Sequence, residues 1–256
     1  MTATNSTELA VSCWAAWAPG LHDRAGWEAW AAGDREISGP VDPDVSFVKP
    51  LLRRRLSPLN RMAFHVASAC LPEGEAPFCI FCSRYGEYAR AFEILNSMAE
   101  GEPVSPNSFS LSVHNTVASL FSISREDRTH STALAAGEAT LEAGFLEACG
   151  LLAEAPQASA LLVYYDEPLP SFYVGTADAI QVSAALAVLL RRPRPSPPRE
   201  TILRLAWRAR PESEARGPKP VNPTLRLAKL LTEAEAQSEF SDGRLTWTWS
   251  RHVAGD

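Results

Sequence analysis

The chain has 256 residues, of which 46% are apolar and 21% charged, and its formal net charge at pH 7 is −6. This composition is that of a globular protein with a sizeable core, and it excludes a disordered or fibrous chain. The acidic balance argues against a nucleic-acid partner, because phosphate binding requires clustered lysines and arginines. The strongest basic cluster is Arg53, Arg54 and Arg55, which we interpret as part of a solvated loop.

The five cysteines are an odd number at scattered positions, which fits a reducing cytoplasm better than secretion. The longest apolar run, residues 182–190, is far too short to span a bilayer. The N-terminus carries no positive charge ahead of its apolar stretch, so it does not resemble a secretory signal. We therefore expect a cytoplasmic protein without membrane insertion.

Strands and helices alternate along the first two-thirds of the chain. In chain order the patterns predict a strand at 8–20, helices at 24–34 and 57–71, a strand at 77–84, helices at 86–101 and 105–123, a strand at 130–136, a helix at 139–153 and a strand at 158–168. The strands are apolar throughout, which indicates burial on both faces. This order favours a layered α/β fold with helices on both sides of a mixed sheet.

The character of the sequence changes after Pro170. The patterns predict a strand at 178–190, a proline-rich loop at 191–200, an exposed edge strand at 201–211, a helix at 222–237 and a last strand at 243–251. We therefore divide the chain into residues 1–170 and a C-terminal extension, residues 171–256, which completes or covers the sheet.

Few residues in the sequence have the spacing that is typical of metal-binding or catalytic groups. Cys79 and Cys82 have a CxxC spacing, but no second ligand pair lies nearby, and residues three apart in a strand point to opposite faces. We interpret them as buried structural thiols and expect no metal site. His114 lies among small and apolar residues, and we interpret it as a hydrogen-bonded histidine embedded in a helix.

Residues 130–144 have the form of a nucleophile elbow, in which a small-residue strand turns sharply into a helix. The turn holds Gly137, Glu138 and Ala139, so neither serine nor cysteine stands there, and Thr140 already lies inside the helix. Glu138 could act as a base by its position. However, a carboxylate at a helix N-terminus is stabilised electrostatically in any protein, so we interpret Glu138 as a structural carboxylate.

Several local phrases match a known family in order and spacing. They are "AVSCWAAWAPG" followed by "GWEAWAAG", then "LSPLNRMAFHVASACL", "PFCIFCSRYGEYAR" and "GEPVSPNSFSLSVHNTVASLFSI". Through these phrases residues 9–170 resemble the N-terminal half of a β-ketoacyl-acyl-carrier-protein synthase, which has a thiolase-type fold. More closely, the chain is similar to the short ketosynthase-like proteins that act as chain-length-factor subunits in bacterial aryl polyene pathways.

The resemblance implies a chain that does not catalyse condensation alone. A ketosynthase carries its acyl chain on a cysteine at the turn after the small-residue strand, where this chain has Gly137 and Glu138. Two histidines from the C-terminal half complete that mechanism, and here His252 stands alone near the end. The implied role is a non-catalytic subunit without a cofactor. It would form a heterodimer with a full-length ketosynthase, shape the acyl tunnel of that partner and transiently bind an acyl carrier protein.

Two sets of site residues follow from the resemblance. The acyl-tunnel set, which would limit chain length, is Ser108, Phe109 and Ser112. The partner-interface set is His114, Asn115, Ser131, Thr132 and Leu134. Two other functions stay open: a stand-alone acyltransferase or thioesterase-like enzyme that uses Glu138, His114 or Thr140, and a homo-oligomeric acyl-binding scaffold.

Overall fold

The computed structural model describes residues 4–40, 42–71, 74–173, 182–194, 199–211 and 221–254. The strands are β1 (Asn5–Trp17), β2 (Phe78–Cys82), β3 (Ser131–Leu134), β4 (Ala160–Asp166), β5 (Ala184–Arg191), β6 (Glu200–Ala209), β7 (Gln237–Ser241) and β8 (Leu245–Ala254). The helices are α1 (Arg24–Ala32), α2 (Pro50–Arg53), α3 (Pro58–Cys70), α4 (Tyr88–Ala99), α5 (Pro106–Ser110), α6 (Thr116–Arg125), α7 (Thr140–Glu154) and α8 (Pro223–Leu231), with short 3₁₀ turns at Gly137–Ala139 and Ser171–Tyr173.

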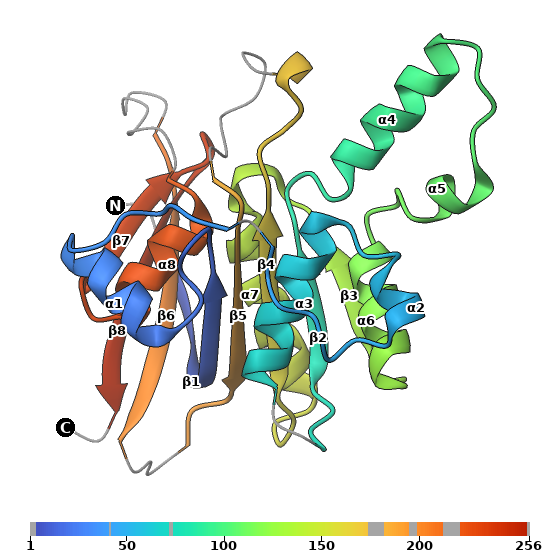
Figure 1. Ribbon diagram of the computed structural model, residues 1–256. Helices are drawn as coiled ribbons and strands as arrows, with labels where there is room; N and C mark the ends of the chain where they lie inside the picture. The colour runs from blue at the N-terminus through green and yellow to red at the C-terminus, as the bar shows by residue number, and fades with distance from the viewer. Residues whose placement is uncertain are drawn as a thin grey trace.

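The strands form one mixed eight-stranded sheet in the order β3-β2-β4-β5-β1-β6-β8-β7 (Figure 1). β2 runs parallel to β3 and β4, whereas the other neighbouring strands are antiparallel. β5, from the C-terminal part of the chain, lies between β4 and β1. The layered α/β fold with a mixed sheet is therefore confirmed, and the C-terminal extension contributes strands to the same sheet as residues 1–170.

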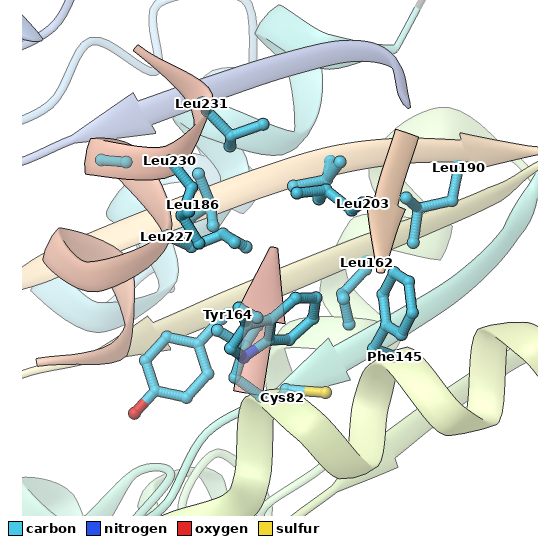
Figure 2. Close-up of a cluster of buried hydrophobic side chains, with 14 of the residues drawn as sticks. Cys82, Phe145, Leu162, Tyr164, Leu186, Leu190, Leu203, Leu227, Leu230 and Leu231 are labelled. Carbon is cyan, nitrogen blue, oxygen red and sulfur yellow. The ribbon is translucent and has the colours of Figure 1, made fainter. Parts of the chain in front are cut away.

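Helices cover both faces of the sheet. On one face α3 and α6 pack over β2, β4 and β5, where Phe64 and Phe81 each contact the ring of Phe121 edge-on. On the other face α7 and α8 pack together. Figure 2 shows Phe145 of α7 and Leu227 of α8 reaching into one cluster of buried side chains with residues from the sheet.

Several helix ends lie where the sequence predicts them. Ser57 caps α3 by accepting a hydrogen bond from the amide of Asn60, and Pro58 occupies the first turn. Asp23 caps α1, and Gly33, with φ of +87°, ends it. None of the helices in the described ranges is both long and apolar enough to cross a membrane.

The single helix predicted at 105–123 is wrong, because the segment forms α5 and α6 with a break between them. The hydroxyls of Ser110 and Ser112 donate to the carbonyls of Asn107 and Phe109, both at 2.9 Å. Serines that bond to nearby backbone groups compete with a continuous helix. The break at 111–115 places His114 in a turn rather than in a helix.

Two predictions in the C-terminal extension are also wrong. The segment 201–211 is not an edge strand, because β6 pairs with β1 on one side and β8 on the other. Its alternating pattern arises because Leu203 and Leu205 are buried whereas Arg204 between them is exposed, which also occurs inside a sheet. The helix predicted at 222–237 ends with α8, and β7 follows as the true edge. Of the other predicted segments, residues 178–181 and 195–198 lie outside the described residues.

Candidate functional site

The elbow predicted at 130–144 is present, and its turn is held together without a nucleophile. β3 leads into the turn at Gly137, whose φ of +61° is in the left-handed region. The hydroxyl of Thr140 accepts a hydrogen bond from the amide of Ala136 at 2.9 Å and donates one to the carbonyl of Gly137 at 2.7 Å. An added Cβ at Gly137 would meet open space. The strand, turn and helix therefore form completely, but no side chain at the turn can carry an acyl group.

Glu138 follows in the same turn and is mostly buried. Its carboxylate lies 3.8 Å from the guanidinium of Arg84, whose side chain is similarly covered. Arg84 also lies over the ring of Tyr85 at 5.1 Å. This pairing orients Glu138 toward the end of β2 and gives it a structural role at the turn.

The ends of β2 and β4 are joined by a buried carboxylate beside the elbow. Asp166 accepts hydrogen bonds from the hydroxyl of Ser83 at 2.8 Å, the phenol of Tyr164 at 2.5 Å and the amide of Arg84 at 3.1 Å. Burial raises the pKa of Asp166, although these donors partly oppose the shift. The network fixes the chain direction after β2 and with it the position of Arg84.

His114 has the structural role predicted for it, although in the turn between α5 and α6. Its Nε2 donates to the carbonyl of Ser83 at 2.9 Å. Its ring packs against Gly86, where φ is +57° and an added Cβ would lie 2.8 Å from the ring. The imidazole therefore ties the α5–α6 turn to the end of β2.

Cys79 and Cys82 are buried on opposite faces of β2, as their spacing predicts. Burial raises the pKa of Cys79 to about 12 and also raises the pKa of Cys82. Both thiols therefore stay protonated at neutral pH and are poor nucleophiles. In the described part of the chain no three His, Cys, Asp or Glu residues are grouped so that they could hold a metal ion.

A cavity of about 710 Å³ lies at the carboxyl ends of β2 and β4, between the start of α3 and the pair α4 and α5. Ser108, one of the predicted tunnel residues, lines it together with Glu87, Arg90 and Glu167. Phe109 and Ser112 lie nearby on and after α5 but do not line this cavity. The structure thus places the predicted tunnel segment beside a cavity.

The carboxylates of this cavity were not found from the sequence. Glu87 is buried, where it accepts from the hydroxyl of Ser57 at 2.7 Å and from the side-chain amide of Asn60 and pairs with Arg90 at 2.9 Å. Burial raises the pKa of Glu87. Burial and the nearby acids raise the pKa of Glu167 to about 7. Glu167 directly follows β4, and Glu87 lies in the segment between β2 and α4. This placement was the signal available in the sequence, because ligands of α/β sheets bind at the carboxyl ends of the strands.

The predicted interface residues lie in two separate places. Ser131, Thr132 and Leu134 are on β3, which pairs with β2 and forms the outer edge of the sheet. His114 and Asn115 lie in the turn before α6, where Asn115 is exposed. The contact between His114 and Ser83 brings this turn close to the end of β2, so both groups lie near the elbow.

Beside this edge, α4 and α5 stand away from the sheet (Figure 1). The described chain buries no residue of α4, and its apolar face leaves Leu95 54% and Met98 58% exposed. Phe109 on α5 is 62% exposed, and Phe172 is 74% exposed and stacks on Phe92. We call α4, α5 and the turn at residues 171–173 the apolar arm.

A family model described as "Beta-ketoacyl synthase, N-terminal domain" matches residues 27–250. The chain belongs to this family. The match continues through most of the C-terminal extension, so the family likeness does not stop at Pro170. The mixed sheet with helices on both faces is the thiolase-like fold of ketosynthases. A comparison with curated protein sequences gave no match.

Solved ketosynthase structures are similar to this chain. A chain of the complex between the ketosynthase ApeO and its chain length factor ApeC from Xenorhabdus doucetiae shares 25% identity, with a TM-score of 0.80 over 95% of this chain and 99% of that one. The ishigamide ketosynthase/chain length factor gives a TM-score of 0.74 at 12% identity, over 97% of this chain and 100% of that one.

A chain of the AntDE:AntF complex, in which a type II acyl-carrier protein is bound to its ketosynthase, gives a TM-score of 0.53 at 10% identity. Here 73% of this chain and 64% of that chain are covered. This ketosynthase-family chain therefore matches the short chains from the first two structures over nearly their whole length and the longer one over only part of it.

Proposed function

We propose that this chain is a non-catalytic chain-length-factor subunit, which pairs with a full-length β-ketoacyl-acyl-carrier-protein synthase in aryl polyene or related polyketide biosynthesis. The observation that carries the proposal is the elbow, in which strand, turn and helix are complete but the turn holds Gly137, Glu138 and Ala139 and neither cysteine nor serine. A chain without the attacking thiolate needs a second chain to perform the condensation. The 25% identity to a chain of the ApeO–ApeC complex supports the same conclusion.

The partner surface that we propose consists of the β3 edge and the apolar arm. An edge strand presents unpaired main-chain groups that a second strand can complete. The arm adds exposed apolar side chains, including Leu95, Met98 and Phe109, of the kind that protein interfaces bury. Ser131, Thr132 and Leu134 belong to the β3 edge, and His114 and Asn115 lie in the turn that follows α5 of the arm, where they would contact the partner.

Within this complex the segment carrying Ser108, Phe109 and Ser112 would line the acyl tunnel of the ketosynthase. Its neighbouring cavity of about 710 Å³ supports that assignment, because small residues beside a cavity leave space for a chain. The acyl carrier protein is the proposed transient partner that delivers this chain. The cytoplasm is the proposed location, and it is supported by five cysteines that are all free.

Co-expression with a full-length β-ketoacyl-acyl-carrier-protein synthase tests the proposal. We expect a 1:1 complex in size-exclusion chromatography with light scattering, and self-association of the chain alone because its apolar arm is exposed. A monodisperse monomer with no affinity for the ketosynthase would overturn the proposal. A stable homodimer that ignores the ketosynthase would favour the acyl-binding scaffold instead.

The stand-alone enzyme has less support in the structure. Glu138 is paired with Arg84, and His114 donates to a backbone carbonyl. Thr140 is buried within the turn, and none of these three residues lines the cavity beside α5. Turnover of acyl-carrier-protein thioesters by the isolated chain, abolished in Glu138→Ala, is the result that would revive this alternative.

A further inference from the structure

Two elements of the C-terminal extension, α8 and β8, meet at one residue in the first turn of α7, and a third, β7, packs against this contact. Glu142 is fully buried, and its Oε1 accepts from the guanidinium of Arg226 at 2.5 Å and from the indole N–H of Trp249 at 2.7 Å. Arg226 comes from α8 and Trp249 from β8. Phe240, on β7, lies under the guanidinium with its ring centroid 3.9 Å away.

Burying these two charged groups costs desolvation free energy, and their hydrogen bonds form only in one relative orientation. Burial raises the pKa of Glu142, which Arg226 and Trp249 oppose by stabilising the charged form. Buried ion pairs often add little stability compared with well-packed apolar residues, but removing one partner leaves an uncompensated charge. Such a pair therefore fixes the relative position of the two helices that carry it, since each charge is compensated only when the partner lies within hydrogen-bonding distance. Phe145 of α7, which contacts Trp249 edge-on at 4.9 Å, adds apolar contact to the same joint.

Glu142 lies only two residues after Thr140, which holds the elbow turn by its bonds to Ala136 and Gly137. The first turn of α7 is thus held locally by Thr140 and from the far part of the chain by Glu142. A rigid helix passes a displacement at Glu142 directly to the turn at Gly137, because the intervening residues are helical.

We propose that Glu142 is a positioning residue, through which the C-terminal extension sets the geometry of the elbow that faces the ketosynthase. The effect on the partner rests on the proposed function, whereas the effect on the elbow itself does not. Arg226 and Trp249 fix the position of Glu142 by donating hydrogen bonds to its carboxylate, and Phe240 holds the guanidinium of Arg226 in place. Through Glu142, α8 and β8 thereby act on the turn beside the β3 edge, although neither of them pairs with β3.

Hydrogen exchange of the isolated chain tests the effect on the elbow. We expect Arg226→Met to speed exchange of the amides at residues 136–140 at least about tenfold, because the buried carboxylate loses its charged partner. Lys229→Met is the matched control, since Lys229 also lies on α8 but its ion pair with Glu235 is half-exposed. Equal protection of residues 136–140 in the wild type and in Arg226→Met would overturn the proposal.

A double variant separates positioning from stability. In Glu142→Gln/Arg226→Met no charge is left buried, so we expect the melting temperature to recover most of the loss seen in Arg226→Met. We still expect fast exchange at the elbow, because the directional pair is absent. If the double variant restores both the melting temperature and the slow exchange, Glu142 is merely structural. Trp249→Phe, which removes only the indole N–H, provides the same comparison if Arg226→Met does not fold.

The partner readout uses the reconstituted complex. We expect Arg226→Met and the double variant to weaken the ketosynthase complex at least about tenfold and to alter product length. Phe64→Leu, in the core on the opposite face of the sheet, is the control for lost stability and should leave both quantities unchanged. A wild-type chain that binds no ketosynthase refutes the proposed function but not the elbow result. Wild-type-like affinity and product length in both Arg226 variants refute the action on the partner.

Discussion

Ser108 is the small residue that the structure places at the edge of the cavity near α5. Small residues leave volume for an acyl chain, and a bulky replacement excludes it sterically. We expect Ser108→Phe to shorten the products of the ketosynthase complex by one or more extensions, and Ser112→Trp to act in the same direction. Product masses from the reconstituted complex measure this. Unchanged product length in both variants, with the complex intact, would exclude these positions from the tunnel.

The burial of Glu167 predicts how the stability of the protein depends on pH. Burial, and then the carboxylates of Glu87 and Asp166, raise its pKa from 4.5 to about 7. The unfolded chain releases this proton near 4.5, whereas the folded chain keeps it until about 7. This contribution to stability is therefore fully present below about 4.5 and is lost as the pH rises to about 7.

Glu167→Gln should remove this slope, because the amide stays neutral at every pH. We expect the melting temperature of the variant to fall less than that of the wild type between pH 5 and pH 7.5. Glu93→Gln is the matched control, since Glu93 lines the same cavity with an exposed side chain. Identical pH profiles for Glu167→Gln and the wild type would contradict the assignment.

At the scale of elements, β3 is the outer strand of the sheet next to the elbow. The carbonyl of His130 accepts a hydrogen bond from the amide of Cys79 on β2, and that of Leu134 accepts one from the amide of Ser83 just after β2. Main-chain groups alternate in direction along a strand, so the amide of Thr132 faces β2 and that of Ala133 faces the open edge. A change at position 132 therefore affects the hydrogen bonds between β3 and β2, whereas a change at position 133 affects those between β3 and the proposed partner strand.

Proline substitutions exploit this alternation, because proline has no N–H to donate. We expect Ala133→Pro to weaken the ketosynthase complex markedly with a small loss of melting temperature. Thr132→Pro should lower the melting temperature more, since it removes a bond to β2. Binding assays and thermal unfolding of both variants provide the comparison. Full ketosynthase affinity in Ala133→Pro would show that the partner does not pair with this edge.

At the scale of the whole molecule, separate groups of exposed arginines lie at the two ends of the central strands. Arg54 and Arg55 are exposed at the cavity end, where Arg90 donates to the carbonyl of Arg55 at 2.8 Å. Arg192 and Arg194 are exposed after β5, which runs antiparallel to β4 and so ends at the opposite side. The length of β4 separates the two groups by about 20 Å.

If an acidic acyl carrier protein approaches the cavity end, charge reversal should matter there and not at the other end. We expect Arg54→Glu/Arg55→Glu to weaken carrier-protein binding to the complex at least about tenfold at low salt, with the difference fading as salt rises. Arg192→Glu/Arg194→Glu changes the net charge equally and is the control. Equal losses in both double variants would indicate a general charge effect instead of docking.

The sheet order also predicts how the chain tolerates division. Residues 171–256 supply β5 and β6, the two neighbours of β1. A fragment ending at Pro170 therefore leaves β1 unpaired, and we expect it to be insoluble or to lack a cooperative unfolding transition. Co-expression of residues 171–256 should restore a soluble, folded assembly. A fragment 1–170 that folds alone by circular dichroism and thermal melting would contradict this expectation.

Local signals in the sequence determined the α/β class, most helix ends and the elbow without a nucleophile. Ser57 and Gly33 end helices by short-range hydrogen bonding and backbone conformation, which depend on a few neighbouring residues. The opposite directions of Cys79 and Cys82 follow from the strand period alone. The absence of cysteine and serine from the turn at residues 137–139 could be read from the sequence without coordinates.

Only the tertiary structure decided which strands are neighbours and which acids come together. Alternation could not distinguish an edge from the interior for β6, because one open face gives the same pattern in either place. The meeting of Glu142 with Arg226 and Trp249 joins residues 84 and 107 positions apart. No local pattern encodes such a contact, because its partners are brought together by long-range packing of the C-terminal extension onto α7.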